Sequence, residues 1–286
     1  SLDRHASPTQ RRETRTRTVR SGPAGVEPRT LATVIGDRQP ERLSFVGAAG
    51  APLSAVVRRP SGPVRGSVLM AHCFTCSKDL HTTTRLARGL VEAGWITFSF
   101  DFTGLGESGG EFATSSVSTN VGDLRRAAVA MLQNDIGPCL LLGHSLGGAA
   151  AVLAAASLHT VDAVICIASP AEVGHIRHLL PDDAADQAER FEISVGGRPF
   201  DLDPQFLDDL DEHDVLDAAR DLQRPMLVVE AGNDTVVDRH QTRALAAAGG
   251  ADIEVVEGAD HLFSSPEHAT KLAEIVVNWA TRSLTR

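Results

Sequence analysis

The chain has 286 residues, an ordinary apolar content of 42% and a formal net charge of −10 at pH 7. That length is enough for one large hydrophobic core or two small ones. An acidic chain is not expected to bind nucleic acid or an anionic membrane surface as its main partner, and no apolar run approaches the length of a membrane span.

Residues 1–40 differ in composition from the rest of the chain. They carry eight arginines against four acidic residues, a charge of +4, and they lack apolar periodicity. We predict a disordered tail here, because such a segment has little apolar surface to bury. An Arg-rich, acid-poor start is also typical of a transit peptide, which is the alternative. With +4 on the tail, the body of the protein, residues 41–286, carries −14.

After the tail, strand patterns alternate with helical ones. Residues 42–47 and 53–60 predict two strands that form a hairpin at a sheet edge. Further strands are predicted from short apolar runs over residues 66–71, 95–100, 139–143, 161–169, 225–231 and 251–258. Helices are predicted over residues 82–94, 118–135, 145–158, 238–249 and 266–284. This alternation predicts a mostly parallel sheet with helices on both faces.

One long segment, residues 170–222, interrupts the alternation. It is acidic and helical in patches, with the turn GGRPF in its middle. An insertion of this length in a parallel α/β sheet predicts a lid over the carboxyl ends of the strands, where ligands bind. The alternative is a small helical excursion with no part in binding.

The motif GHSLG, residues 143–147, lies between a predicted strand and a predicted helix. This is the context of a nucleophile elbow, in which a sharp turn presents a serine at the carboxyl edge of the sheet. Glycines at both ends of the motif let the backbone turn tightly. We therefore predict Ser145 as a catalytic nucleophile, and a serine that only caps a helix is the alternative.

A serine nucleophile needs a base, and the base needs an acid that orients it. His261 follows the last predicted strand and is the candidate base, although the chain has 11 histidines. Asp234 follows the strand before it and is the candidate acid, with Asp238 and Glu230 as competitors. Glu230 is expected to lie within a strand, and Asp238 to cap the next helix. The resulting order Ser, Asp, His is that of α/β-hydrolases.

Several longer motifs carry a family resemblance. They are AHCFTCSKD (71–79), FDFTGLGESGGEF (100–112), GHSLGGAA (143–150), GRPFDLDPQFLDDL (197–210) and GADHLF (258–263). From Leu43 onward the chain resembles an α/β-hydrolase, and more narrowly the hydrolase half of α/β-hydrolase/OsmC-like fusion proteins. The resemblance implies a doubly wound, mostly parallel sheet of about eight strands with a small helical lid insertion. No OsmC-like segment follows the last predicted helix, so we expect a free-standing relative or a piece of a fusion.

The same resemblance assigns an oxyanion hole. In α/β-hydrolases the loop after the third strand begins His-Gly, and the backbone N–H of the next residue points into the hole. His72-Cys73-Phe74 stands at that position here. The N–H groups of Phe74 and Leu146 are therefore expected to hold the oxyanion, with His72 anchoring the loop. Asp101, after the fourth strand, is expected to hold a turn, or alternatively to be a carboxylate near the site.

The spacing of Cys73 and Cys76 leaves three interpretations open. The simplest is two small residues that line the floor of the pocket. A reversible disulfide between them is a second possibility, and a zinc site with His72 and His81 is a third, although its spacing is wrong for the usual structural fingers. The other two cysteines, Cys139 and Cys166, lie in apolar runs and are expected to be buried.

These observations predict a serine hydrolase that cleaves carboxylic esters through an acyl-enzyme, with a small-molecule ester as substrate and no metal or organic cofactor. One alternative is an acyltransferase or perhydrolase that uses the same triad. Another is a non-catalytic sensor or interaction module on a hydrolase fold. No signal-peptide pattern is visible, so a cytoplasmic location is expected. The oligomeric state does not follow from the sequence.

Overall fold

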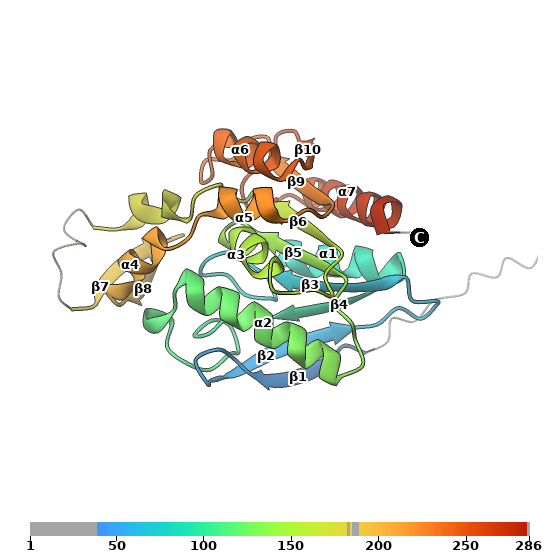
Figure 1. Ribbon diagram of the computed structural model, residues 1–286, viewed down its shortest axis with the longest axis horizontal. Coiled ribbons are helices and arrows are strands. Elements are labelled where there is room, and N and C mark those ends of the chain that lie inside the picture. The colour runs from blue at the N-terminus through green and yellow to red at the C-terminus, as the bar shows by residue number, and fades with distance from the viewer. Residues whose placement is uncertain (1–38, 182–183, 185–188, 285–286) are drawn as a thin grey trace, which may run out of the picture. The chain divides into compact units, whose positions relative to one another are not determined.

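The computed structural model of the protein describes residues 39–181, 184 and 189–284. Its main sheet has eight strands in the order β1-β2-β4-β3-β5-β6-β9-β10 (Figure 1). The strands are β1 (Glu41–Val46), β2 (Pro52–Arg58), β3 (Gly66–Ala71), β4 (Trp95–Phe100), β5 (Leu140–His144), β6 (Ala163–Ile167), β9 (Met226–Ala231) and β10 (Asp252–Val256). Strand β2 pairs antiparallel with β1 and with β4, and the other pairs of this sheet are parallel. The predicted mostly parallel sheet and its edge hairpin are confirmed.

Helices cover both faces of the sheet. The α-helices of the described residues are α1 (His81–Glu92), α2 (Val117–Gln133), α3 (Leu146–Ala155), α4 (Gln205–Asp211), α5 (Val215–Asp221), α6 (Arg239–Gly249) and α7 (Pro266–Leu284), of which α4 lies in the insertion described below. Helices α1 and α7 pack together on one face, and α2, α3 and α6 lie on the other (Figure 1). The α/β-hydrolase fold expected from the motifs is therefore the observed one.

The central strands are mostly apolar because both of their faces are buried. In β3, Val68 and Met70 belong to the core beneath α1 and α7, whereas Leu69 belongs to the core beneath α2 and α3. Successive side chains of a strand point to opposite faces, so a strand inside a doubly covered sheet has no solvent-facing position. Each fully buried side chain of this kind contributes about 1.5–3 kcal/mol relative to an exposed one.

Local signals place the helices as well. Ser116 caps the start of α2, where its hydroxyl oxygen accepts a hydrogen bond from the N–H of Thr119 at 3.1 Å. Val117, Val121 and Leu124 recur at helical spacing and are buried against the sheet. These two features orient α2 with its apolar stripe toward the core.

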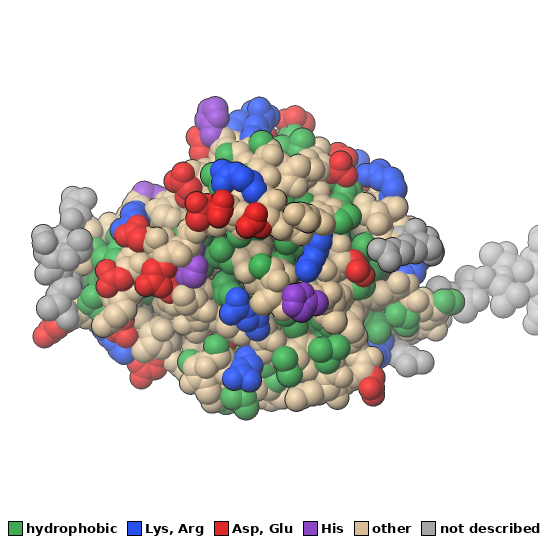
Figure 2. Space-filling model, in the orientation of Figure 1, with side chains coloured by type: hydrophobic (Ala, Val, Ile, Leu, Met, Phe, Trp, Pro, Cys, Tyr) green, Lys and Arg blue, Asp and Glu red, His purple; other side chains and the backbone are tan. Residues whose placement is uncertain are grey.

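Residues 170–222 form the insertion between β6 and β9. A 3₁₀ segment (Val173–Leu179) is followed by a β-hairpin of β7 (Phe191–Val195) and β8 (Arg198–Leu202), then by α4 and α5. The sequence pattern predicts only helical patches and a turn here, so the hairpin is a correction. In FEISV, residues 191–195, buried and exposed side chains alternate with the period of a strand. Helix α5 packs against α3 and α6, and acidic side chains gather over it in Figure 2.

The predicted tail, residues 1–40, lies outside the described residues except for its last two positions. Strand β1 begins at Glu41, so the predicted start of the body coincides with the start of the sheet. In the part of the chain that the structure describes, no helix is both long and apolar enough to cross a membrane.

Candidate active site

Ser145 lies in a sharp turn between the end of β5 and the start of α3. Its φ of 55° is in the left-handed region, which a non-glycine residue rarely adopts. The turn needs glycine on both sides: a Cβ on Gly143 would lie 2.3 Å from the carbonyl oxygen of Gly147, and a Cβ on Gly147 would lie 2.2 Å from that of His72. The N–H of Ser145 donates to the carbonyl of Ile167 on β6 at 2.8 Å, which ties the strained turn to the sheet.

His261 and Asp234 come from the loops that follow β10 and β9, and the structure brings them into contact. Nδ1 of His261 lies 2.8 Å from Oδ2 of Asp234, whose side chain is only 4% exposed. The other carboxylate oxygen accepts hydrogen bonds from the N–H groups of Val236 and Val237 at 2.8 and 2.9 Å. Asp234 is thus held by the backbone on one side and faces the imidazole on the other.

The environment of Asp234 favours its ionised form. Burial alone would raise the pKa of this carboxyl, but the hydrogen bond and charge of His261 and the two amides outweigh burial and lower the pKa below its usual value. For a lowered carboxyl pKa, the associated stability is fully present above the unfolded value of 3.8 and is lost as the pH falls through the folded pKa. At neutral pH the group is therefore a carboxylate.

The two competing acids have other partners. Glu230 lies within β9, where Arg239 and Arg243 donate to its buried carboxylate. Asp238 caps α6 by accepting from the N–H of His240 at 2.8 Å. Both placements are those expected from the sequence, and neither acid is hydrogen-bonded to His261 in the described part of the chain.

Ser145 and His261 line the same cavity, which has a volume of about 590 Å³. Part of its wall comes from the loop after β3, including Phe74 and both cysteines of the C-x-x-C motif. The insertion supplies the opposite wall through His175, Ile176, His178, Leu179, Val195, Gly196 and Arg198. Residues at the carboxyl edge of the sheet and residues of the insertion thus line the same cavity.

His144 is a residue of the site that the sequence analysis missed. Its Nε2–H donates to the backbone carbonyl of His261 at 2.8 Å, and the two imidazole rings lie 5.1 Å apart. Burial, reinforced by the neighbouring charge of His261, lowers the pKa of His144 to about 3, so its ring is neutral and carries its proton on Nε2. His144 therefore fixes the backbone of His261 from the strand that precedes Ser145.

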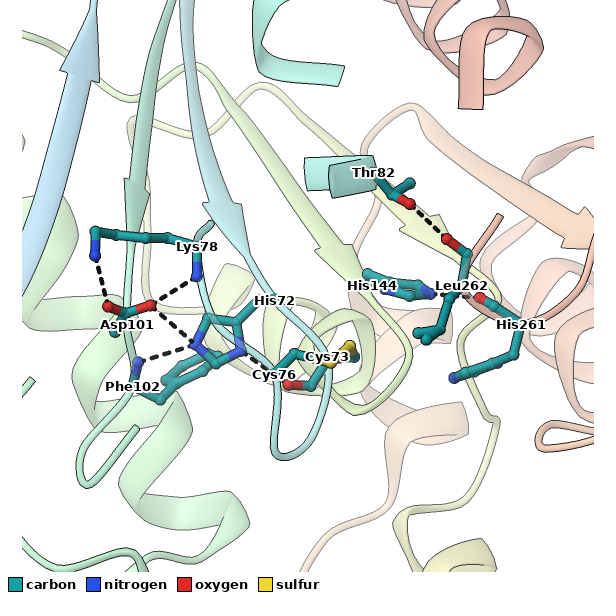
Figure 3. The surroundings of a disulfide bond; sticks show 10 residues. All are labelled: His72, Cys73, Cys76, Lys78, Thr82, Asp101, Phe102, His144, His261 and Leu262. Carbon is teal, nitrogen blue, oxygen red and sulfur yellow. Dashed lines mark hydrogen bonds and ion pairs between the residues drawn. A yellow bond between two sulfur atoms is a disulfide. The ribbon is translucent and has the colours of Figure 1, made fainter. Parts of the chain in front are cut away.

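Residues 72–78 include the expected oxyanion donor Phe74 and are called the oxyanion loop for that expectation. They are anchored at both ends (Figure 3). At one end, Nδ1–H of His72 donates to the carbonyl of Cys73, and Nε2 accepts from the N–H of Phe102 at 3.1 Å. At the other end, Asp101 accepts from the backbone N–H and the ammonium group of Lys78 at 2.6 and 2.7 Å. The expected anchoring by His72 and the expected turn-holding role of Asp101 are both present.

Lys78 is buried, which nothing in its local sequence indicated. Its side chain is 1% exposed, and its ammonium group contacts both Asp101 and Glu107. Burial would lower the pKa of Lys78, but the hydrogen bonds to these two carboxylates outweigh burial and raise it. The same contact, together with Arg42, lowers the pKa of Glu107 to about 2. Lys78 is thus a charged cross-link between the oxyanion loop and the loop after β4.

Lys78→Met is expected to lower the free energy of unfolding by about 3–5 kcal/mol, because it leaves the fully buried Asp101 without its counter-charge. Urea denaturation monitored by circular dichroism measures this change. Lys271→Met is the matched control, since Lys271 is 60% exposed and pairs with Glu274 on the surface of α7. The control is expected to stay within about 0.5 kcal/mol of the wild type. Equal losses in the two variants would contradict a special role for Lys78.

Cys73 and Cys76 are joined by a disulfide in the structure (Figure 3). They line the cavity, as the simplest interpretation of the sequence has it, but they do so as a bonded pair. Because each sulfur is bonded to the other and His72 uses both ring nitrogens within the fold, the alternative zinc site does not agree with this arrangement. The remaining cysteines are free thiols: Cys166 is buried and Cys139 is partly buried.

Comparisons with known proteins agree with this fold. Residues 68–275 match the model of the Alpha/beta hydrolase family. Similar solved structures include the esterase domain from a Rhodothermus marinus protein, with 32% identity, a TM-score of 0.72, and coverage of 86% of this chain and 100% of that one. Est1E from Butyrivibrio proteoclasticus, with 18% identity, a TM-score of 0.72, and coverage of 86% and 99%, shares the fold. No curated protein matches the chain. Because the family model spans most of the chain, the chain belongs to the alpha/beta hydrolase family.

Proposed function

We propose that the protein is a serine hydrolase that cleaves carboxylic esters through an acyl-enzyme. The observation that carries this proposal is the placement of Ser145, on a strained elbow, in the same cavity as His261, which is hydrogen-bonded to a buried carboxylate. The similar esterase domain from Rhodothermus marinus supports the choice of esters. A nucleophile, a base and an orienting acid are the groups that acyl transfer through a covalent intermediate requires.

In the proposed mechanism, the hydroxyl oxygen of Ser145 attacks the ester carbonyl while Nε2 of His261 takes the hydroxyl proton. Asp234 holds the proton on Nδ1 of His261 and stabilises the imidazolium that forms. His261 then protonates the leaving alcohol. A water molecule, activated by the same imidazole, releases the acid from Ser145. No step needs a metal or an organic cofactor.

The oxyanion of the tetrahedral intermediate is assigned to the backbone N–H groups of Phe74 and Leu146. Leu146 is the first residue of α3, and the first amides of a helix have no partner within it. Phe74 lies in the oxyanion loop, and its ring contacts Phe112 and Phe206, with centroids 5.4 and 5.9 Å away. Donors held this way need no reorganisation when charge develops on the substrate oxygen.

The insertion is proposed to act as a lid that selects the substrate. The residues that it presents to the cavity include the apolar Ile176, Leu179 and Val195. Burial lowers the pKa of His175 to about 4, so this lining imidazole is neutral at physiological pH. A modest apolar acyl chain is the substrate portion that this wall suits. From the motifs shared with them, we also propose that the chain is related, within the α/β-hydrolases, to the hydrolase half of OsmC-like fusion proteins.

Hydrolysis of p-nitrophenyl esters of increasing acyl length tests the function. We expect turnover with a preference for short to medium chains, and covalent labelling of Ser145 by a fluorophosphonate, located by peptide mass spectrometry. Adding an alcohol or hydrogen peroxide to the assay measures how the acyl group partitions between hydrolysis, transfer and perhydrolysis. A correctly folded protein that neither turns over these esters nor reacts with the fluorophosphonate would contradict the proposal and favour a non-catalytic role.

A further inference from the structure

The middle of the oxyanion loop has few tethers of its own. Its ends are held by His72 and Lys78. Between these ends, the Phe74 ring packs against Phe112 and Phe206, and in the described residues the backbone is held by one turn hydrogen bond and the disulfide. The hydrogen bond runs from the N–H of Cys76 to the carbonyl of Cys73 at 3.1 Å. The disulfide joins the same two residues, whose Cα atoms are 5.3 Å apart. It therefore closes a four-residue ring around Phe74 and Thr75.

Thr75, inside this ring, has an unfavourable backbone conformation. Its φ is 60°, in the left-handed region, and its side chain is buried. A β-branched residue is a genuine outlier there, because its branched side chain clashes with its own backbone. Such a conformation persists only where the surroundings hold it, and a residue that is free to relax would leave it. Relaxation of Thr75 would reorient the peptide units on both sides of it and shift the N–H of Cys76. That N–H donates to the carbonyl of Cys73, which shares its peptide unit with the N–H of Phe74.

We propose that the Cys73–Cys76 disulfide is a positioning element of the oxyanion hole: it holds Thr75 in the left-handed conformation and thereby keeps the N–H of Phe74 aimed at the site beside Ser145. This inference rests on the proposed function. The disulfide form is then the more active enzyme, and the dithiol form has a loop that leaves the productive geometry for part of the time. The cysteines touch no reacting atom in this role, so they are positioning residues.

The chemistry that interconverts the two forms is thiol–disulfide exchange. A thiolate of an external dithiol attacks one sulfur, the Cys73–Cys76 bond breaks and a mixed disulfide forms. The cysteine that was not attacked leaves as a thiolate in this step. The second thiol of the reagent then attacks the reagent's own sulfur in the mixed disulfide and releases the attacked cysteine. Two electrons and two protons pass to the protein, which gains two thiols, and the reagent becomes a cyclic disulfide. Cys76 is partly exposed and lines the cavity, so a small reagent reaches the bond from the substrate side.

The first experiment compares the oxidised enzyme with the same enzyme reduced by dithiothreitol, using one p-nitrophenyl ester. Removing an oxyanion donor outright costs about 10²–10³ in kcat, so a donor that is misplaced for part of the time is expected to lower kcat by about 10- to 100-fold. KM is expected to change by less than about threefold, because the hole acts in the transition state. Thiol titration of the denatured protein should rise from two to four thiols per chain, since Cys139 and Cys166 are already free. Reoxidation should restore kcat.

Two variants separate positioning from mere stability. The double variant Cys73→Ser/Cys76→Ser should resemble the reduced wild type and should not respond to dithiothreitol. Thr75→Gly should lose much less activity on reduction than the wild type does, because glycine adopts a φ of 60° without strain and needs no clamp. The quantity compared is the ratio of oxidised to reduced kcat within each protein. A disulfide that only stabilises the fold would not make this ratio depend on residue 75.

The outcomes are distinct. Ester hydrolysis that requires Ser145 but stays within twofold on reduction, or increases, would overturn the inference and leave the proposed function intact. The same holds if Thr75→Gly loses as much on reduction as the wild type. Absence of hydrolysis and of fluorophosphonate labelling in both redox forms would overturn the proposed function and this inference together.

Discussion

Ser145→Ala is expected to lower kcat for ester hydrolysis by about a millionfold, since removing the nucleophile of a serine triad abolishes the covalent route. The variant should fold normally, because alanine keeps the Cβ of the strained elbow and the backbone bond from residue 145 to Ile167. Steady-state kinetics on a p-nitrophenyl ester, with urea denaturation of the same preparation, measure the two properties separately.

Ser157→Ala is the matched control for this change. Ser157 follows the other end of α3, is exposed, and hydrogen-bonds the carbonyl of Ala154 and the side chain of Arg125. Its replacement is expected to leave kcat unchanged within experimental error. Activity of Ser145→Ala above a few per cent, in a preparation free of other esterases, would mean that another residue is the nucleophile.

Asp234→Asn is expected to lower kcat by about 10⁴-fold. Asparagine keeps the size of the side chain and can still accept from the N–H groups of Val236 and Val237, but it no longer stabilises the imidazolium and it favours the wrong tautomer of His261. The fall should appear in kcat more than in KM, because the carboxylate acts on the base and not on the bound ester.

Asp238→Asn provides the comparison, four residues further along the chain. Asparagine caps a helix about as well as aspartate, so α6 should keep its start and the activity should be nearly unchanged. If Asp238→Asn is the damaging change and Asp234→Asn the silent one, then the acid has been assigned to the wrong residue. If both are silent, the proposed mechanism has no orienting acid.

The redox state of the Cys73–Cys76 pair depends on the compartment in which the protein is found. Thiols of cytoplasmic proteins are kept reduced by glutathione and thioredoxin, so the cytoplasmic location expected from the sequence would favour the dithiol form. Under the proposed positioning role, the protein would then have low activity until an oxidant restored the bond. Measuring the redox state of Cys73 and Cys76 in rapidly acid-quenched cells would show which form is present.

The sequence by itself determined most of the sheet and the three candidate triad residues. Strands β3 and β4 and helix α7 have the predicted bounds, because continuous apolar runs and a helical period are local signals of how a segment is buried. Ser145, Asp234 and His261 each follow a predicted strand, and parallel strands bring their carboxyl ends to one edge. Their meeting was therefore predictable, and so was the capping role of Asp238.

The tertiary structure alone decided the features that depend on distant partners. Lys78 is buried because Asp101 and Glu107 reach it from the loop after β4, and His144 orients His261 across 117 positions of sequence. The β7–β8 hairpin pairs within an insertion whose helical patches concealed it. The disulfide was one of three open interpretations until the loop set Cys73 and Cys76 side by side. For Lys78 and His144 the contact joins two segments that are distant in the sequence, so neither segment predicts it alone. The hairpin and the disulfide join neighbouring residues, and there the local sequence allowed more than one outcome.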